Sequence, residues 1–392
     1  MSAYVRVAGG LVKRSAIEEL AQVDAVIFDC DGVLIDVRGS YDRAVIESVR
    51  LVIEGAFGME LPDTALGSEP IYLLRKTGGF NNDLDAAWIM ALWLFAGAEE
   101  LAVRELGERL ERVLGSRPKG PRELWDAVVA EAPRGSYPKR ILRTNPVPLE
   151  VLLERAPRTG RSHATRDDVE SVVRIVAQDR GIFREYELFK EFLGTGRTYG
   201  RDLLETVFDD LYYGSEVVRS LFGSGPHFDF GRGLYANEVP VVDGATLVRL
   251  EELIGSGRMG IVTGRDSVTT WMVLGDLKAF FREGACVFIA DELRRGGPET
   301  LMKPSPYGLL KSAAALGPRS SPLYVGNSAE DLHSSRYAES YGLRTLFAAV
   351  VGLHPDPEAA AVDFAARGAD LVVEDVKQLV DVLEALRRRS IW

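Results

Sequence analysis

An apolar stretch near the start of the chain, residues 26–36, carries two carboxylates, separated by one residue, just before a glycine interrupts it. Its first half has the composition of a buried strand, and Gly32 interrupts it. Side chains two positions apart on a strand point to the same side, so Asp29 and Asp31 would crowd together there. Such crowding costs free energy unless a cation lies nearby, and Mg²⁺ with oxygen ligands is the usual cation. The alternative is an ordinary Asp-Gly turn at the end of a strand.

The sequence after this stretch changes to helical spacing and keeps it for most of the first half of the chain. Helices are predicted at residues 41–54, 84–98, 99–114, 122–131, 169–178, 182–193 and 201–213. Residues 132–161 are rich in Pro, Arg and Gly and lack periodicity, so we expect an exposed excursion or a flap there.

From about residue 240, strands and helices alternate. Strands are expected at residues 259–263, 286–290, 323–326, 344–350 and 371–374, with helices between and after them, including one over residues 266–281. This alternation predicts a parallel sheet covered by helices on both faces. Because the first strand lies at residues 23–29, the sequence predicts an α/β core formed by residues 1–36 and 241–392, interrupted by an all-helical domain at residues 37–240.

Composition excludes several classes of protein. A formal net charge of −11 argues against a binder of nucleic-acid backbones, which needs a basic face. The longest apolar run, residues 86–98, is shorter than the ~20 residues of a membrane-spanning helix, and no signal peptide is expected. Cys30 and Cys286 each lie in or beside a predicted strand and are expected to be free, which suits a reducing cytoplasm. We therefore expect a soluble cytoplasmic protein; its oligomeric state is left open.

Three later loops carry polar residues suited to chemistry. Thr263-Gly264-Arg265 follows a predicted strand and offers a hydroxyl, a flexible backbone and a cation, although a simple turn capped by Asp266 would look the same. Lys303 precedes a proline-started helix, where an ordinary surface lysine is the alternative. Residues 326–331 (GNSAED) end a predicted strand at a glycine and then offer amide, hydroxyl and carboxylate groups. A capped helix start would also explain them.

Together and in this order, these segments resemble the four motifs of the haloacid dehalogenase (HAD) superfamily. The motifs are Asp29-Cys30-Asp31-Gly32, Thr263-Gly264-Arg265, Lys303-Pro304 and the GNSAED segment. The resemblance covers residues 23–36 and about 241–376. It implies a Rossmann-like α/β core with an inserted helical cap that selects the substrate. It also implies a Mg²⁺-dependent phosphatase that hydrolyses a small phosphorylated metabolite through an aspartyl-phosphate.

The resemblance also assigns roles to individual residues. Asp29 would be the nucleophile and a metal ligand, and Asp31 the acid and base whose backbone carbonyl also reaches the metal. Thr263 and Lys303 would serve catalysis by holding the phosphoryl group and offsetting charge. The implied substrate-binding residues are Gly32, Thr263, Gly264, Arg265 and Lys303, and the implied metal ligands are Asp29, Asp31, Asn327 and Asp331.

The chain departs from the family pattern at one position. Asn327 stands where the family usually has Asp, and an amide oxygen can bind Mg²⁺ but brings no charge. Weaker metal binding is expected unless Asp331 or Glu330 compensates. Asn327 thus leaves open a catalytically weak member that binds phosphate and regulates, and a phosphomutase of the same family is a second enzymatic alternative. The acid at position 31 argues against dehalogenation.

Overall fold

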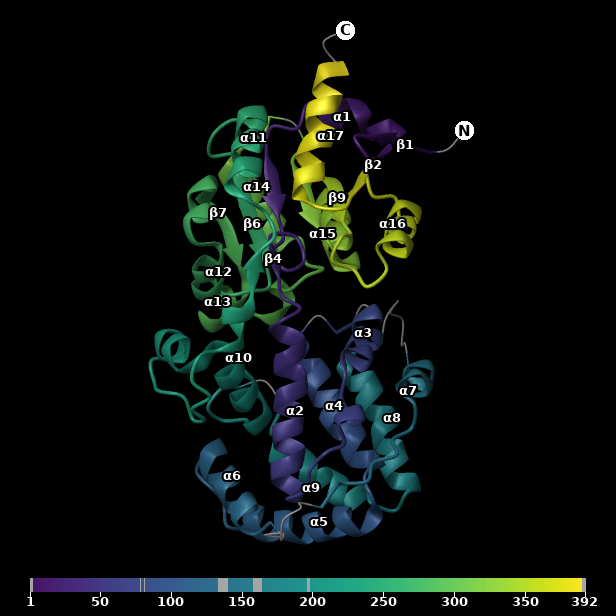
Figure 1. Ribbon diagram of the computed structural model, residues 1–392, viewed down its shortest axis with the longest axis vertical. Coiled ribbons are helices and arrows are strands. Elements are labelled where there is room, and N and C mark those ends of the chain that lie inside the picture. The colour runs from purple at the N-terminus through teal and green to yellow at the C-terminus, as the bar shows by residue number, and fades with distance from the viewer. Residues whose placement is uncertain are drawn as a thin grey trace. The chain divides into compact units, whose positions relative to one another are not determined.

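The computed structural model describes residues 3–77, 79–80, 82–132, 140–157, 164–195, 198–319 and 321–389. The chain divides into two compact units (Figure 1). One unit comprises Met1–Val37 together with Glu238–Trp392, and the other comprises Arg38–Asn237. The first is an α/β unit made from the two ends of the chain, and the second is helical.

The α/β unit is built on an eight-stranded sheet in the order β1-β2-β10-β9-β8-β3-β6-β7. Its strands are β1 (Tyr4–Val7), β2 (Gly10–Lys13), β3 (Val26–Phe28), β6 (Met259–Thr263), β7 (Phe281–Phe288), β8 (Leu323–Gly326), β9 (Leu346–Val350) and β10 (Leu371–Val373). The six strands from β10 to β7 run parallel, and β2 joins β10 antiparallel. This confirms the predicted α/β class, a mostly parallel sheet.

Helices cover both faces of this sheet. One face packs against α1 (Ile17–Ala21), α11 (Gly244–Ile254) and α17 (Val376–Arg389), and the other against α14 (Tyr307–Leu316), α15 (Ala329–Glu339) and α16 (Pro357–Ala366). Successive residues of a strand point to opposite faces. Val26 and Phe28 accordingly enter the first apolar core and Ile27 the second, so β3 is buried on both sides.

A short antiparallel ribbon marks the place where the helical insertion leaves and rejoins the α/β unit. Its strands are β4 (Ile35–Asp36) and β5 (Val239–Pro240), and the Val241 amide donates to the Leu34 carbonyl at 2.9 Å. β4 begins four residues after Asp31. The returning strand is thereby tied to the loop that carries the first motif.

The helical unit contains α2 (Tyr41–Phe57), α3 (Ser68–Lys76), α4 (Asp83–Gly97), α5 (Glu100–Gly115), α6 (Pro121–Ala130), α7 (Leu149–Arg155), α8 (Arg166–Asp179), α9 (Phe183–Leu193) and α10 (Leu203–Phe222). α4 is apolar on nearly every side and is buried among its neighbours. The rings of Phe95 on α4 and Phe189 on α9 stack with centroids 4.4 Å apart. Trp88 and Phe95 therefore belong to the core of this unit.

Several elements differ from the sequence-based expectation. The hairpin β1–β2 was not predicted, and the helix expected over residues 266–281 ends at Leu274 because Gly275 takes a left-handed conformation with φ of 53°. β7 then begins at Phe281, earlier than expected, since an edge strand tolerates the exposed polar residues 282–284. Of the excursion expected at residues 132–161, residues 133–139 and 158–161 lie outside the described ranges, and the rest contains α7.

Two further expectations concern composition. Cys30 is buried, Cys286 is partly buried, and both are free thiols, as predicted. Within the described ranges, none of the helices combines the length and the apolar character needed to span a membrane.

Candidate active site

The topology gathers the polar motifs at one edge of the sheet. β3 lies between β6 and β8, with Phe28 paired to Ile261 on one side and to Val325 on the other. Because these strands are parallel, the residues that follow them emerge at the same edge, where open α/β sheets bind ligands. Asp29 follows β3, Thr263 ends β6 and Asn327 follows β8. The structure thus brings together segments from both ends of the chain.

A buried charge cluster lies at this edge. The Lys303 ammonium is 2.7 Å from Asp29 Oδ1 and 2.7 Å from Asp331 Oδ1, and it also faces the Tyr324 ring at 5.8 Å. Both carboxylates are buried, and within the described ranges Lys303 is the one cation that forms an ion pair with either of them. Lys303 is therefore no ordinary surface lysine, which was the alternative interpretation of its position.

Burial and neighbouring charges shift the pKa values of the groups in this cluster. Burial raises the pKa of Asp29 to about 7, an effect that Lys303 partly opposes and that Asp331 and Asp31 reinforce. Burial next to Asp331 likewise raises the pKa of Glu330 to about 8. Burial alone would lower the pKa of Lys303, but Asp29 and Asp331 outweigh it and raise that pKa well above its usual value. The cluster therefore has more buried acid than base.

Asp331 holds the loop between β8 and α15 in place. Its Oδ2 accepts hydrogen bonds from the Asn327 amide at 3.1 Å, the Ser328 amide at 3.0 Å and the Ser328 hydroxyl at 2.8 Å. Its Oδ1 accepts one from the Tyr324 hydroxyl at 2.6 Å in addition to the Lys303 contact. Ser328 and Asp331 form a capping box at the start of α15. Both oxygens of Asp331 are thus engaged by the chain itself.

Removing the Tyr324 hydroxyl is expected to destabilise this cluster. Tyr324→Phe deletes a hydrogen bond to a buried carboxylate, so the free energy of unfolding should fall by about 1.5–3 kcal/mol. Urea denaturation of the variant and the wild type measures the difference. Tyr307→Phe removes a part-exposed hydroxyl near Lys311 and is the control, with a change expected within ~0.5 kcal/mol. Equal effects of the two substitutions would contradict the proposed importance of the buried bond.

Asp31 lies in a tight turn beside the nucleophile candidate. The amides of Val33, Leu34 and Ile35 all donate to the Cys30 carbonyl, and the Gly32 amide donates to the Ile35 carbonyl. The Asp31 side chain points to Arg265, whose Nη1 lies 2.8 Å from Asp31 Oδ1. The turn gives the two aspartates different surroundings, Asp29 beside Lys303 and Asp31 beside Arg265.

Two glycines allow the loops to approach one another. Gly32 has φ of 71°, and a Cβ there would lie 2.1 Å from Asn327 Nδ2. A Cβ at Gly326 would lie 2.5 Å from the Asp331 side chain. The Asn327 side chain therefore lies directly against the turn that carries Asp31, while the Asn327 carbonyl accepts a hydrogen bond from His354 Nε2 at 2.8 Å.

The second motif divides into residues with different surroundings. Thr263 is buried at the end of β6, and its hydroxyl accepts a bond from the Arg265 amide at 3.3 Å. Gly264 is exposed, with no atom near the place where a Cβ would be. Arg265 is buried, and its guanidinium contacts residues of the chain. Gly264 is thus the part of this motif that faces open space.

The donor atoms at the edge suit a hard cation such as Mg²⁺. Asp29 offers a carboxylate, Asn327 an amide oxygen, and the buried acids outnumber the nearby base. Among the described residues, no three His, Cys, Asp or Glu side chains form a metal-binding group, so any metal here would also need amide, carbonyl or water oxygens. The residues fit a magnesium ion that keeps several waters.

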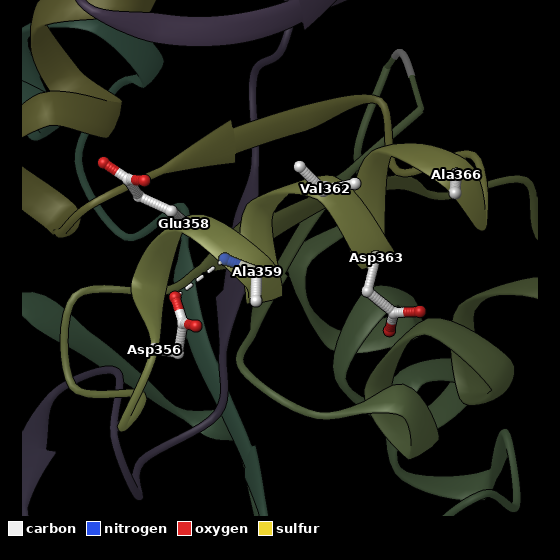
Figure 2. A pocket seen from close by; sticks show the side chains of 6 residues that line it. All are labelled: Asp356, Glu358, Ala359, Val362, Asp363 and Ala366. Carbon is white, nitrogen blue, oxygen red and sulfur yellow. Dashed lines mark hydrogen bonds between the residues drawn. The ribbon is translucent and has the colours of Figure 1, made fainter.

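A surface depression on α16 lies outside this cluster. It is lined by Asp356, Glu358, Ala359, Val362, Asp363 and Ala366. Figure 2 shows that its acidic side chains diverge, and that the Asp356 carboxylate caps the helix by accepting from the Ala359 amide at 2.9 Å. None of the motif residues lines it, so it is a helix surface with local capping.

Sequence reasoning missed three side chains that hold the site together: Tyr324, His354 and Glu238. Tyr324 stands in an otherwise apolar strand, and a buried tyrosine hydroxyl needs a partner, which was a usable signal. Glu238 is a charged residue immediately before the returning strand β5 and binds Arg265. His354 lies beyond the fourth motif, and nothing in its local sequence indicates that it contacts Asn327.

Comparison with known proteins gives structural similarities alone. No protein-family model matches the chain, and no curated protein matches it. A structural-genomics target solved by X-ray crystallography matches with a TM-score of 0.63 at 17% identity, over 93% of this chain and 100% of the other. A phosphatase from Thermococcus thioreducens matches at 0.45 and 21% identity, covering 88% and 99% of the two chains. A haloacid dehalogenase-like protein from Agrobacterium tumefaciens matches at 0.38 and 16%, covering 93% and 99%.

The two matches with TM-scores of 0.45 and 0.38 are too weak to support the fold. The first similarity extends over nearly the whole of both chains and supports the fold. The chain therefore has a mostly parallel α/β core that is interrupted in sequence by a helical insertion, and the first similarity supports this fold.

Proposed function

We propose that the protein is a Mg²⁺-dependent phosphatase that hydrolyses a small phosphorylated metabolite through a phosphorylated aspartate. The observation that carries this proposal is the buried Asp29 carboxylate at the end of the central strand, held 2.7 Å from the Lys303 ammonium. A carboxylate beside a fixed cation at this edge is suited to attack a phosphoryl group, whose negative charge the cation offsets.

The reaction would run in two steps. In the first, an Asp29 oxygen attacks phosphorus, the bond to the leaving oxygen breaks, and Asp31 donates a proton to that oxygen. In the second, Asp31 takes a proton from a water molecule that attacks the aspartyl-phosphate, which releases phosphate and restores Asp29. Thr263, Gly264 and Lys303 are the residues we assign to hold the phosphoryl oxygens.

A bound Mg²⁺ would neutralise charge on the phosphoryl group and on Asp29. We assign Asp29, the Asp31 carbonyl and Asn327 as its protein ligands. Asp331 has both oxygens engaged by other groups, so its role in this proposal is to fix the loop and to orient Lys303. Glu330 is buried nearby, and because burial raises its pKa to about 8 it adds little negative charge at neutral pH.

The basic test is hydrolysis of 4-nitrophenyl phosphate with and without Mg²⁺. Release of phosphate that stops on treatment with EDTA and returns on addition of Mg²⁺ is the expected result. Activity against a panel of phosphorylated metabolites then identifies the substrate. A protein that binds Mg²⁺ but releases no phosphate from any substrate would contradict the proposal.

Asn327 favours a second candidate, a phosphate-binding regulatory protein with little turnover. Because an amide lacks the charge of a carboxylate, Asn327→Asp should lower the Mg²⁺ concentration for half-maximal activity by roughly tenfold or more. Asn145→Asp adds the same charge at an exposed position of the helical unit and is the control. A near-zero wild-type rate that rises sharply in Asn327→Asp would support the regulatory candidate, and efficient wild-type turnover would exclude it.

A further inference from the structure

Arg265 lies two residues beyond the end of strand β6, and its side chain turns inward. The side chain is 1% exposed, although the neighbouring Gly264 lies at the surface. A buried guanidinium needs partners for its N–H groups and for its charge. The identity of those partners therefore decides what the residue does.

The guanidinium forms a fork between two carboxylates. Its Nη1 donates to Asp31 Oδ1 at 2.8 Å, its Nη2 donates to Glu238 Oε2 at 2.6 Å, and its Nε donates to the Thr270 hydroxyl at 3.1 Å. All three nitrogens thus bond to residues of the same unit. A phosphoryl group could reach this guanidinium only by displacing buried charge-assisted bonds, which are among the stronger hydrogen bonds in proteins.

Glu238 keeps the guanidinium in its place independently of Asp31. The Glu238 side chain is completely buried, and it immediately precedes β5, which pairs with β4. β4 itself continues the turn that carries Asp31. The ion pair and the ribbon together connect the two chain segments on which Asp31 and Glu238 lie.

The position of the Asp31 carboxylate depends on its hydrogen bond to the Arg265 guanidinium. Arg265 is the one side-chain partner that the described residues give it, and 35% of its side chain is exposed. Oδ1 is engaged by the guanidinium, so Oδ2 is the atom left to carry and receive a proton. An exposed aspartate without such a partner would sample several rotamers.

We propose that Arg265 is a positioning residue that fixes the Asp31 carboxylate for proton transfer, with Glu238 as its anchor, instead of the phosphate-binding residue that the second motif implies. This inference rests on the proposed phosphatase function. It assigns to Arg265 and Glu238 an effect on leaving-group protonation and on water activation, and none on the affinity for phosphate.

The variant Arg265→Lys tests the proposal with the least disturbance. Lysine keeps a cation beside Glu238 but has a single ammonium in place of the fork. We expect kcat for phenyl phosphate to fall about tenfold or more, toward the range typical of a lost acid–base group. KM and the inhibition constant of inorganic phosphate should stay within about twofold, since no phosphate contact is lost.

A comparison of two leaving groups distinguishes the loss of Asp31 positioning from general damage to the active site. 4-Nitrophenolate departs readily without a proton, whereas phenolate is a poorer leaving group and gains more from protonation. Arg265→Lys and Asp31→Asn should therefore both slow the first step more for phenyl phosphate than for 4-nitrophenyl phosphate. Stopped-flow or quenched single-turnover measurements compare the two substrates. Equal losses with both substrates would overturn the proposal.

A double-mutant cycle provides the second readout. If Arg265 acts only through Asp31, adding Arg265→Lys to Asp31→Asn should lower kcat by no more than about twofold further. If Arg265 binds the phosphoryl group, the two losses multiply, and the inhibition constant of inorganic phosphate rises in every variant that lacks the arginine. The latter result would overturn the proposal.

Two further variants guard against misfolding. Arg265→Gln combined with Glu238→Gln removes both buried charges together, and it should reproduce the leaving-group effect if Arg265→Lys fails to fold. Arg258→Gln is the matched control: Arg258 lies before the opposite end of β6 and donates to the Leu316 and Gly317 carbonyls, so kcat should not change. Wild-type protein without phosphatase activity would refute the proposed function itself, whereas an active wild type with additive losses would refute only the role of Arg265.

Discussion

Asp29→Asn is expected to abolish phosphate release from 4-nitrophenyl phosphate while leaving the fold intact. The amide keeps the shape of the buried carboxylate but is a far weaker nucleophile, so the first step has no attacking group. Loss of the Asp29 carboxylate leaves Lys303 paired with Asp331 alone, so the charge of the ammonium is still compensated. Activity is measured as released phosphate, and folding as the circular dichroism spectrum and the urea midpoint.

Glu358→Gln is the control for this substitution. It removes one carboxylate from the surface depression on α16 and should leave the rate unchanged. Retained activity in a correctly folded Asp29→Asn protein would contradict the assignment of the nucleophile. Loss of activity in the control would indicate that α16 contributes to the reaction.

Lys303→Met is expected to abolish activity and to destabilise the protein strongly. Two buried carboxylates, Asp29 and Asp331, share this one ammonium, and removing it leaves both without a charge partner. Breaking a buried ion pair from one side typically costs about 3–5 kcal/mol, and the free energy of unfolding should fall by that amount. Urea denaturation at neutral pH provides the measurement.

Lys311→Met gives the matched comparison. Lys311 forms an exposed ion pair with Glu292 at 2.6 Å, and such pairs contribute about 0–1 kcal/mol. A loss of stability in Lys303→Met no greater than in this control would contradict the account of a buried cation shared by two acids.

The alternation of strands and helices after residue 240 predicted five of the six parallel strands of the sheet. The apolar stretch before Asp29 predicted the strand β3, and the second and fourth motifs fell at the ends of its neighbours β6 and β8, whereas Lys303 lies in the loop before α14. Parallel strands bury both faces, so their residues form continuous apolar runs that are easily recognised. The contact between Lys303 and Asp29 was expected only from the resemblance to the haloacid dehalogenase superfamily, which implies that Lys303 offsets the charge of Asp29.

The direction of individual side chains was not predictable in this way. Arg265 reaches Asp31 across 234 positions of sequence and turns away from the surface that its neighbour Gly264 faces. The hairpin β1–β2 was missed because its residues form too short an alternating pattern, and its pairing with β10 depends on contacts across nearly the whole chain. The local sequence shows the periodicity of a helix or a strand. Contacts between residues far apart in the chain depend on the fold and are not visible in that periodicity.

The most direct test of the account is the time course of 4-nitrophenolate release by Asp31→Asn. Because 4-nitrophenolate needs no proton to leave, Asp29 should still be phosphorylated, while hydrolysis of the aspartyl-phosphate lacks its base. We expect a burst of one product molecule per enzyme followed by a slow phase, with acid-quenched protein carrying phosphate on the peptide that contains Asp29. A linear time course from the first turnover, or phosphate on a different residue, would contradict it.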